Sequence, residues 1–472
     1  MEPVNRQYLK VSATCPLCDA AEIAYEFVVA GVAYSACRAC RLLFANPSPP
    51  LTPLKASVQA RAMIRLAIEL AEFYARSRPR RIAIVGHVQE SSVENIAVLT
   101  PEALESQSDP YDLIVVLGGV ERVADPHELL QQVKRKLAAN GTVALLYPSI
   151  ASAGAVSQRD KWVAFHEKLG YFFAPDTIQS LATRCGYGDF LSFVNAADTN
   201  LGEDRAVQQW FETGALMLCR PAGTRNADLL SVIFPVYNER ATVEESLQRV
   251  LRKEIPGVRI EIIVVESNST DGSREIVERY RDHPRVRIVH EDRPRGKGHA
   301  VRAGLEHASG EVILFQDADL EYDVGDYDNL VAPLFELRQN FVLGSRHDAR
   351  GQAWKIRHFE KQQTLSSVVN LAHLFLLWMF NRLYRQSLQD PFTMYKVFRR
   401  DCLYGLRFHC DRFDFDYEIN IKLLRKGYQP LEIPINYVSR PFSEGKKVSF
   451  FGDPPTWIRA MLKLRRAPLY ER

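Results

Sequence analysis

Four apolar segments in the C-terminal half of the chain constrain its fold most strongly. They read "LLSVIFPVY", "IEIIVVES", "VRIVHE" and "EVILFQDAD", and they span residues 229–237, 260–267, 286–291 and 311–319. Helical stretches separate them, and such strand–helix alternation indicates a mostly parallel sheet covered by helices. The first, second and fourth segments run into polar residues. Since the carboxyl ends of parallel strands share one edge, these residues should meet where such sheets bind ligands.

Two aspartates at the last of these strand ends are suited to hold a metal ion. Asp317 and Asp319 stand one residue apart in "QDADLEYD", so both carboxylates can turn toward one hard cation and its waters. Mg²⁺ or Mn²⁺ held there would neutralise a diphosphate leaving group. The pair alone is a weak signal. Together with "PVYNE" and "VESNSTDG" at the two other strand ends, it predicts a nucleotide site.

The length of the chain predicts more than one domain. Its 472 residues exceed one ordinary domain, and residues 220–228, "RPAGTRNAD", have the composition of a linker. We therefore expect an α/β chain with a ribbon at residues 1–50, a Rossmann-like domain at 51–222 and a second one at 229–472. A net charge of +3 argues against a general nucleic-acid binder.

Two Cys-x-x-Cys pairs near the start of the chain predict a structural zinc site. The pairs are separated by 18 residues, a spacing that suits two short knuckles around one tetrahedral ion. Four thiolates leave no open coordination position, so the ion should stabilise the fold rather than catalyse. A redox role is disfavoured because one pair would suffice for it. The expected zinc ligands are Cys15, Cys18, Cys37 and Cys40.

The first 220 residues resemble class I S-adenosylmethionine-dependent methyltransferases that begin with a zinc ribbon. The resemblance is carried by "CPLC…CRACRLLFANPSPP", by "YDLIVVLGGVERVADPHELLQQVKRKLAANGTVALLYPS" at residues 111–149 and by "YFFAPDTIQSLATRCGY" at residues 171–187. It implies a Rossmann-like, methyltransferase-type fold for the middle of the chain.

The cofactor site of such a methyltransferase is expected to be lost. Its glycine-rich turn would follow residues 82–85, yet only Gly86 is present there. Only 25 residues separate Gly86 from Asp112, too few to include the second strand, whose acidic end would bind the cofactor ribose. We therefore expect the domain to be inactive and not to bind S-adenosylmethionine, and we expect Gly86→Ala to preserve activity. The alternative is an active methyltransferase that uses Glu94 or Glu121.

Residues 229–465 resemble family 2 glycosyltransferases of the GT-A fold, and among them the dolichol- and polyprenyl-phosphate sugar synthases. Here "VESNSTDGS" stands in place of the family's "VDDGSTDGT". Glu266 occupies the position of an aspartate that reads the base, and Ser267 replaces a second aspartate, which bears on the identity of the base. The resemblance implies the following nucleotide-sugar residues: Pro235, Tyr237, Glu239, Glu266, Asp271, Lys297, Asp317 and Asp319.

The resemblance extends to the acceptor side through residues 342–351, 388–401 and 413–448. The middle segment matches "D-x-x-T-G-Y-K-x-F-R" with Met394 at the glycine position. From the residues alone, the aspartates could instead cap a helix and the cations could form a solvated charge run. The resemblance implies catalytic roles for Arg346, Asp390, Asp416 and Glu418, and acceptor or phosphate contacts for Lys396, Arg440, Lys446 and Lys447.

The resemblance implies an inverting, metal-dependent transfer from a nucleotide-diphosphate sugar. A polyprenyl phosphate or related lipid-linked acceptor is the leading expectation, and such an anion needs no strong base. A hydroxyl acceptor on a glycan, protein or small molecule would need a carboxylate to take its proton. Asp390 is then preferred over Asp416 and Glu418.

The sequence also predicts where the protein acts. The start of the chain shows no basic region followed by an apolar one, so we expect no secretory signal, and the longest apolar stretch, at residues 368–380, is too short to span a bilayer. Residues 364–384 and the basic tail suit helices that lie on a membrane surface or pack against the core. We expect a cytoplasmic protein, peripheral on the inner face of the membrane.

Two further hypotheses concern the N-terminal half. The chain could be a bifunctional enzyme that also methylates the sugar or the product. The methyltransferase-like part could instead be a binding module that recruits a partner protein or orients the acceptor.

Overall fold

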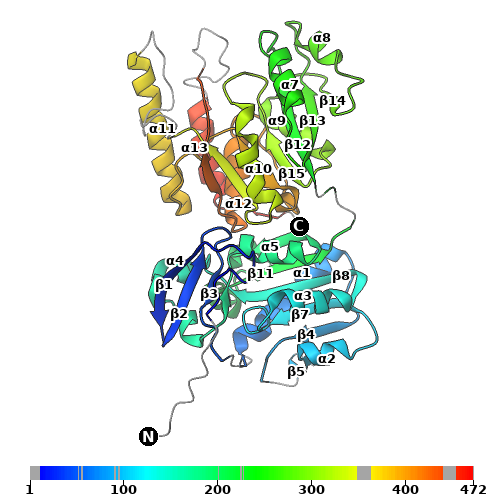
Figure 1. Ribbon diagram of the computed structural model, residues 1–472, viewed down its shortest axis with the longest axis vertical. Coiled ribbons are helices and arrows are strands. Elements are labelled where there is room, and N and C mark those ends of the chain that lie inside the picture. Colours follow the sequence, from blue (N-terminus) through cyan, green and yellow to red (C-terminus); the bar gives the residue numbers. More distant parts are fainter. Residues whose placement is uncertain are drawn as a thin grey trace.

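The computed structural model shows a lower part built from residues before 222 and an upper part built from residues after 228 (Figure 1). The structure describes residues 11–50, 53–54, 57–89, 92–93, 96–199, 201–223, 226, 228–347, 363–439 and 453–470.

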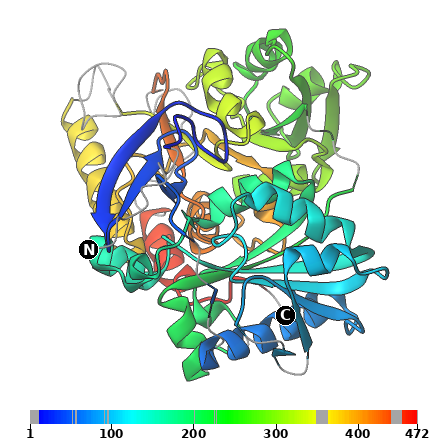
Figure 2. The same cartoon turned by 60° about the horizontal axis from the view of Figure 1, so that its bottom comes forward.

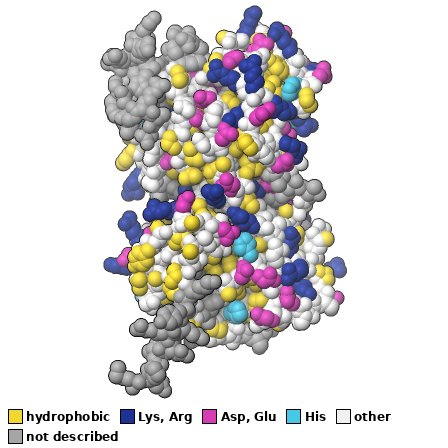
Figure 3. Space-filling view, viewed as in Figure 1, with side chains coloured by type: hydrophobic (Ala, Val, Ile, Leu, Met, Phe, Trp, Pro, Cys, Tyr) yellow, Lys and Arg dark blue, Asp and Glu magenta, His cyan; other side chains and the backbone are white. Residues whose placement is uncertain are grey.

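The ribbon is a small antiparallel sheet in the order β1-β2-β3-β9. Its last strand comes from far along the chain, so the ribbon sheet is completed by a segment beyond residue 50. Aromatic rings of Tyr34, Phe165 and Phe172 pack beneath it. Hydrophobic side chains also gather on its outer side (Figure 3), where Tyr25 and Val28 are exposed. The strands are β1 (Ile23–Val29), β2 (Val32–Cys37), β3 (Leu43–Ala45) and β9 (Tyr171–Phe172).

The second sheet has seven strands in the order β10-β11-β8-β7-β4-β6-β5. Strands β8, β7, β4 and β6 are parallel, as the Rossmann-like expectation requires, while β10, β11 and β5 pair antiparallel to their neighbours. The strands are β4 (Ile82–Val85), β5 (Ser92–Val93), β6 (Ile96–Leu99), β7 (Tyr111–Leu117), β8 (Leu137–Pro148), β10 (Tyr187–Phe193) and β11 (Gly214–Pro221).

Helices cover this sheet. Helix α1 begins after Ser57, whose side chain accepts a hydrogen bond from the Ala60 amide and so caps the first turn. The helices are α1 (Val58–Ala75), α2 (Pro101–Glu105), α3 (Pro126–Arg135), α4 (Ala153–Gln158), α5 (Pro175–Arg184) and α6 (Arg205–Phe211), with single 3₁₀ turns at Arg159–Lys161, Val163–Glu167 and Ala196–Asp198.

The expectation that a strand is missing after Gly86 is wrong. Strand β6 occupies that place and pairs parallel with β4 through Ile84–Val98 and Val85–Leu99. Among the described residues, no helix lies between β4 and β6; the two-residue strand β5 lies there instead. The connection is short because the helical crossover is absent from these residues, not because the strand is.

The third sheet has seven strands in the order β14-β13-β12-β15-β17-β16-β18. Strands β12, β13, β14 and β15 are parallel, and β17 runs antiparallel to both of its neighbours. Strand β12 is buried almost throughout, as continuous apolar runs predict for a sheet covered on both faces. The strands are β12 (Leu229–Val236), β13 (Arg259–Glu266), β14 (Val286–His290), β15 (Val312–Phe315), β16 (Phe341–Ser345), β17 (Lys396–Arg399) and β18 (Leu431–Pro434).

The helices of the upper part surround this sheet, and α7 shows how they pack. Its buried stripe is Val243, Leu247 and Val250, at helical spacing. The helices are α7 (Val243–Arg252), α8 (Ser273–Glu278), α9 (Lys297–His307), α10 (Tyr327–Phe335), α11 (Gln363–Tyr384), α12 (Phe415–Arg425) and α13 (Asp453–Leu464), with 3₁₀ turns at Val324–Asp326 and Arg400–Leu403.

The two parts lie against each other (Figure 2), and both apolar contacts, such as that of Phe193 with Tyr470, and hydrogen bonds cross between them. Lys426 is fully buried there and donates to the Phe190 carbonyl of the lower part at 3.0 Å and to two carbonyls of its own part. Further hydrogen bonds run from Arg41 to the Gln429 carbonyl, from Asn340 to the Asp176 carbonyl and from the Ser192 amide to the Tyr470 hydroxyl.

Candidate functional site

The carboxyl ends of β12, β13 and β15 border a pocket of about 570 Å³. Pro235 and Tyr237 line it from β12 and the residue after it, and Ser267 lines it from the end of β13. Asp317 and Asp319 follow β15 and line it as well. The predicted meeting of three strand ends at one sheet edge is confirmed by the register of these strands.

Asp317 and Asp319 both line this pocket, but their carboxylates have different partners. Lys297, at the first position of α9, lies 2.7 Å from the Asp317 carboxylate. Burial lowers the pKa of Lys297, but the charges of Asp317 and Asp416 outweigh it and raise the pKa above the usual value. Asp319 is 9% exposed, and its carboxylate accepts a hydrogen bond from the Glu321 amide at 3.0 Å.

A divalent cation would find few protein ligands at this pair. Among the described residues, the cluster of four N-terminal cysteines alone brings three or more potential metal-binding side chains together. The carboxylates of Asp317 and Asp319 are oxygen donors of the kind that Mg²⁺ and Mn²⁺ prefer. A cation held by them would take its remaining ligands from phosphate oxygens and water.

Two of the eight expected nucleotide-sugar residues lie behind the pocket wall rather than in it. Glu266 is fully buried, and its carboxylate accepts hydrogen bonds from the amides of Asn268 and Ser269. Asp271 accepts from the Arg240 amide and from Ser273. Both therefore fix the loop after β13. The other six line the pocket: Pro235, Tyr237, Glu239, Lys297, Asp317 and Asp319.

Arg346 and Asp390 form a buried ion pair at the acceptor side. The Arg346 Nε lies 2.7 Å from Asp390 Oδ2 and its Nη2 lies 2.8 Å from Oδ1. Asp390 is fully buried; burial raises its pKa, but the paired guanidinium holds it well below the usual value. Arg346 lines the pocket, whereas Asp390 does not. A carboxylate engaged in this way is a poor proton acceptor, so the preference for Asp390 as a base is not supported by its geometry.

Asp416 is the expected catalytic carboxylate that faces the pocket. It lies in the first turn of α12, and its Oδ1 is 3.2 Å from the Nζ of Lys396. Lys396 is fully buried, and burial lowers its pKa. Lys396 therefore holds Asp416 rather than lining the pocket itself.

Glu418 lies away from the pocket. It is fully buried, accepts hydrogen bonds from the amides of His409 and Cys410, and pairs with Lys422 at 2.8 Å. Its contacts stabilise the loop before α12. The three expected phosphate ligands Arg440, Lys446 and Lys447 lie outside the described residues.

Sequence reasoning missed an apolar wall that completes the pocket. The wall comes from α11, α12 and α13 and from nearby loops, and the rings of Tyr417 and Trp457 stack there with centroids 5.7 Å apart. The apolar character of residues 364–384 was visible, but nothing in the sequence indicated which surface they would face. The apolar and aromatic lining residues that were missed are Ala372, Phe375, Leu376, Phe392, Phe413, Tyr417, Tyr437, Trp457 and Ile458.

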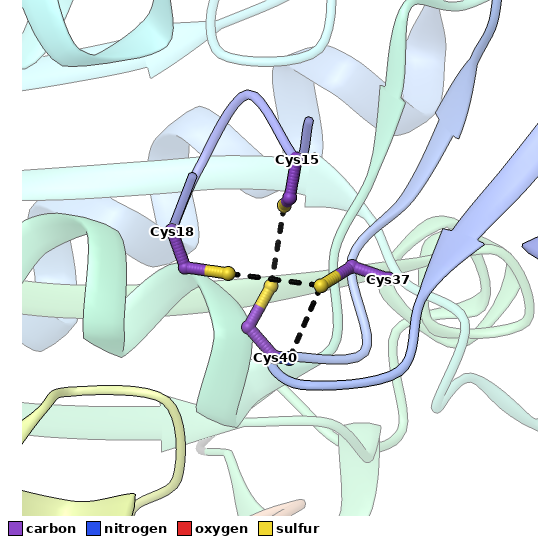
Figure 4. A group of neighbouring side chains, drawn as sticks. All are labelled: Cys15, Cys18, Cys37 and Cys40. Atoms are coloured by element: carbon purple, nitrogen blue, oxygen red, sulfur yellow. Dashed lines mark hydrogen bonds between the residues drawn. The ribbon is translucent and has the colours of Figure 1, made fainter. Parts of the chain in front are cut away.

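The four N-terminal cysteines converge as the spacing predicts (Figure 4). Their Sγ atoms lie within 4.8 Å of one another, and Cys15–Cys40 and Cys18–Cys37 are each 3.6 Å apart. Hydrogen bonds among the thiols lower the pKa of Cys18 and of Cys37 and raise the pKa of Cys15 and of Cys40, so two of the four thiols lose their protons more easily. Four sulfur donors in one cluster fit a tetrahedral zinc ion.

The crevice at the carboxyl ends of β4 and β7 is filled by the chain itself. The Leu54 amide donates to the His87 carbonyl at 2.7 Å, and the Gln89 amide donates to the Leu54 carbonyl at 2.9 Å. The Leu54 side chain reaches within 3.0 Å of the place where a Cβ on Gly118 would stand. Strand β6 is followed by Thr100, which caps α2 and is not acidic.

The packing of this crevice makes Gly86→Ala costly to stability, and the expectation that activity survives the replacement stays a prediction. A Cβ on Gly86 would lie 2.0 Å from the Leu117 carbonyl oxygen. The glycine is needed for the close approach of β4 to the end of β7. Of the two acids proposed for an active methyltransferase, Glu121 is buried 3.7 Å from Arg122, and Glu94 lies outside the described residues.

Comparison with protein families gives two matches. Residues 231–403 match the model of glycosyl transferase family 2. Residues 16–189 match the model of a methyltransferase domain. The two matched segments correspond to the upper and lower parts of the molecule.

Curated relatives match this chain over less than half of its length. The glycosyltransferase AglD of Haloferax volcanii is 27% identical over 46% of this chain and 34% of its own length. A dolichyl-phosphate beta-glucosyltransferase of Drosophila melanogaster is 31% identical over 41% of this chain and 64% of its own length. The chain thus spans less than two thirds of either relative.

Two solved structures are similar to part of this chain. A mannosyltransferase of Pyrobaculum calidifontis, in complex with GDP-Man and Mn²⁺, is 24% identical over 43% of this chain and 54% of its own, with a TM-score of 0.30. Glucosyl-3-phosphoglycerate synthase of Mycobacterium tuberculosis, in complex with UDP, is 21% identical over 53% of this chain and 87% of its own, with a TM-score of 0.38.

Proposed function

We propose that this chain, which contains a family 2 glycosyltransferase domain and a methyltransferase-type domain, transfers a sugar from a nucleotide-diphosphate sugar to an acceptor. The observation that carries the proposal is the pocket at the strand ends, which combines Asp317 and Asp319 with the cations Lys297 and Arg346. Carboxylates that can hold a metal, beside cations that can contact phosphates, suit a nucleoside diphosphate.

The transfer is an inverting displacement. The acceptor oxygen forms a bond to the anomeric carbon from the face opposite the diphosphate. The bond between that carbon and the diphosphate oxygen breaks, and its electron pair leaves with the nucleoside diphosphate. Lys297 is oriented by Asp317 and stabilises the departing charge. A divalent cation bound by Asp317 and Asp319 would neutralise the diphosphate further.

The acceptor is a polyprenyl phosphate or a related lipid-linked phosphate. Two observations support this choice: the apolar wall shares the pocket with the charged residues, and Arg346 lines the same pocket. The wall suits an isoprenoid chain, and the guanidinium suits its phosphate. The dolichyl-phosphate glucosyltransferase among the relatives is consistent with this acceptor class.

A lipid phosphate is already an anion, so the transfer to it needs no strong base. If the acceptor is instead a hydroxyl on a glycan, protein or small molecule, Asp416 is the base. It lines the pocket, whereas Asp390 and Glu418 are buried in ion pairs behind it. The choice of acceptor therefore decides whether a proton must be moved.

A partition assay tests the acceptor. Purified chain is incubated with labelled nucleotide sugars and Mn²⁺, with polyprenyl phosphate or with water-soluble glycans and peptides. We expect the label to enter the organic phase only when polyprenyl phosphate is present. Label confined to water-soluble products would replace the lipid acceptor by a hydroxyl acceptor. Absence of turnover with every donor would contradict the glycosyltransferase proposal.

The methyltransferase-type half serves as a scaffold or binding module and does not use S-adenosylmethionine. This proposal is supported by Leu54, which fills the crevice, and by Thr100, which stands where an acidic residue would bind the ribose. Titration calorimetry with S-adenosylmethionine tests it. We expect no heat of binding, and a measurable affinity would favour the bifunctional enzyme instead.

The protein acts in the cytoplasm, bound peripherally at the inner face of the membrane. Helix α11 supports this proposal because it exposes Leu371, Phe375 and Trp378 at helical spacing. Next to it, Arg459 and Lys463 of α13 border a shallow second groove. Apolar side chains flanked by cations suit an anionic membrane surface. None of the helices in the described ranges is long and apolar enough to cross a bilayer.

A further inference from the structure

A hydrogen-bonded chain of three side chains lies at and behind the pocket wall beside the end of β13. Ser267 lines the pocket at the end of β13, and its Oγ lies 2.5 Å from Glu291 Oε2. The other Glu291 oxygen, Oε1, pairs with His299 Nδ1. Glu291 is 8% exposed and does not line the pocket, so it reaches a ligand only through Ser267.

The chain is held at both ends. The Glu291 amide donates to the Glu266 carbonyl at 2.9 Å, which ties the segment after β14 to the end of β13. The far ring nitrogen of His299 lies 3.3 Å from an Arg295 guanidinium nitrogen. The Ser267 amide donates to the Val236 carbonyl at 3.0 Å. The serine hydroxyl therefore has a fixed position and a fixed partner.

The donors and acceptors of these groups determine whether Ser267 can donate or accept a hydrogen bond toward the pocket. A serine hydroxyl has one proton and two lone pairs, and an ionised carboxylate can only accept. The Ser267 proton is therefore committed to Glu291. Toward the pocket, Ser267 presents lone pairs alone, so it can only accept a hydrogen bond from a ligand.

We propose that Ser267, oriented by Glu291 and His299, selects donors whose base carries a ring N–H. The proposal rests on the nucleotide-sugar function proposed above and deepens it. Uracil and thymine offer N3–H, and guanine offers N1–H. Cytosine and adenine carry a lone pair on the corresponding ring nitrogen, which would face the lone pairs of Ser267. Two buried acceptors facing each other leave both unsatisfied, which disfavours these bases.

Glu291 thus makes Ser267 a hydrogen-bond acceptor toward the pocket, which a carboxylate at position 267 would be directly. In this relation Ser267 contacts the base, and Glu291 and His299 are positioning residues. Because Glu291 accepts the Ser267 proton, Ser267 offers a ligand only hydrogen-bond acceptors. An acidic side chain at this position would do the same.

Calorimetric titration with UDP, GDP, CDP and ADP in the presence of Mn²⁺ tests the proposal. We expect wild-type chain to bind UDP or GDP at least about tenfold more tightly than CDP and ADP. In Glu291→Gln the amide can donate to Ser267, which frees the hydroxyl proton to turn into the pocket. We therefore expect the preference to fall toward unity in Glu291→Gln and in Ser267→Ala.

A rescue variant and a matched control complete the design. Ser267→Asp combined with Glu291→Gln returns an acceptor to position 267 and should restore the preference. Ser231 and Glu261 form a similar pair, with their oxygens 2.5 Å apart, near the opposite end of β12. Glu261→Gln should leave the preference unchanged, which separates base selection from general loosening of the sheet.

The outcomes distinguish failure of this inference from failure of the nucleotide-sugar function on which it rests. If wild-type chain binds no nucleoside diphosphate, the nucleotide-sugar proposal fails and the inference fails with it. If all four nucleotides bind and Glu291→Gln keeps the wild-type preference, the inference alone is overturned. A preference for CDP or ADP in the wild type would also overturn it.

Discussion

Asp390 anchors Arg346, and its removal should damage stability more than chemistry. Replacing one member of a buried ion pair leaves the other charge buried and unpaired, which costs about 3–5 kcal/mol. We expect Asp390→Asn to lower the free energy of unfolding by about this amount in urea titrations. Asp228 also binds an arginine through two contacts of 2.7 Å, but both partners are exposed. Asp228→Asn should therefore change stability little, and equal losses in both variants would contradict the anchoring role.

Asp416 should behave differently because it faces the pocket. Asp416→Asn keeps an oxygen for the hydrogen bond from Lys396 but removes the charge opposite this fully buried ammonium, so the melting temperature should fall and kinetics are measured well below it. With a hydroxyl acceptor, kcat should fall about 10²- to 10⁴-fold because no base remains. With a lipid phosphate, kcat should change little. Kinetics with both acceptor types decide between these cases, and a loss of rate confined to the lipid phosphate would contradict the assignment.

Gly86 supports the packing of β4 against the end of β7. Its missing side chain admits the Leu117 carbonyl, so Gly86→Ala must shift buried backbone, and overpacking of this kind costs about 1–3 kcal/mol. Gly223→Ala is the matched control, because a Cβ there would meet no atom within 4 Å. We expect thermal unfolding to show a lower melting temperature for Gly86→Ala alone. A wild-type melting temperature for Gly86→Ala would contradict this.

The sequence predicts the kinds of site residue better than their roles. Asp319 could be placed because a strand end determines its surroundings. Asp390, Glu418 and Glu266 could not, because their roles depend on partners such as Arg346 that only the folded chain brings near. Motif position indicates that a carboxylate is present, but its burial and its partner decide what it does.

At the scale of elements, helix α11 exposes an apolar stripe whose membrane contact can be measured. We expect the triple variant Leu371→Ser, Phe375→Ser and Trp378→Ser to reduce sedimentation with anionic vesicles at least about tenfold. The reason is that three exposed apolar side chains lose their favourable transfer out of water. Val163→Ser changes a similarly exposed apolar residue of the lower part and serves as the control. Unchanged sedimentation of the triple variant would contradict the proposed membrane face.

The strands predicted from the sequence are those with buried apolar runs. Strands β12, β13, β14 and β15 match the four segments closely, because continuous burial leaves a strong pattern. Strand β6 was missed, since it has four residues and the described residues between it and β4 include no helix. The insertion of antiparallel β17 between β15 and β16 could not be predicted either, since pairing order depends on contacts distant in sequence.

At the scale of the whole molecule, the four-cysteine cluster lies close to the interface between the two parts. The Ala39 carbonyl, between two of the cysteines, accepts a hydrogen bond from Gln339 at 3.1 Å. Arg41 donates to the Gln429 carbonyl just before β18, and Glu432 of β18 accepts from the Asp390 amide. Contacts thus run from the cluster to the residue that anchors Arg346.

Metal removal should therefore weaken both parts of the molecule. Structural zinc contributes directly to folding, so chelation or Cys40→Ser should lower the melting temperature in calorimetric scans of the lower part and of the upper part. Cys410→Ser changes a cysteine outside the cluster and should not respond to chelators differently from the wild type. Unchanged unfolding of the upper part after metal removal would contradict the coupling.

The proposed activity is tested most directly by turnover of a nucleotide sugar as a function of Mn²⁺ concentration. Wild-type chain is compared with Asp319→Ala and with Asp282→Ala, which changes an exposed aspartate in a turn away from the pocket. We expect wild-type chain and Asp282→Ala to need Mn²⁺ and to turn over alike, while Asp319→Ala is inactive at every Mn²⁺ concentration. Full activity of Asp319→Ala, or wild-type activity without any divalent cation, would contradict the assignment of the metal and of the transfer site.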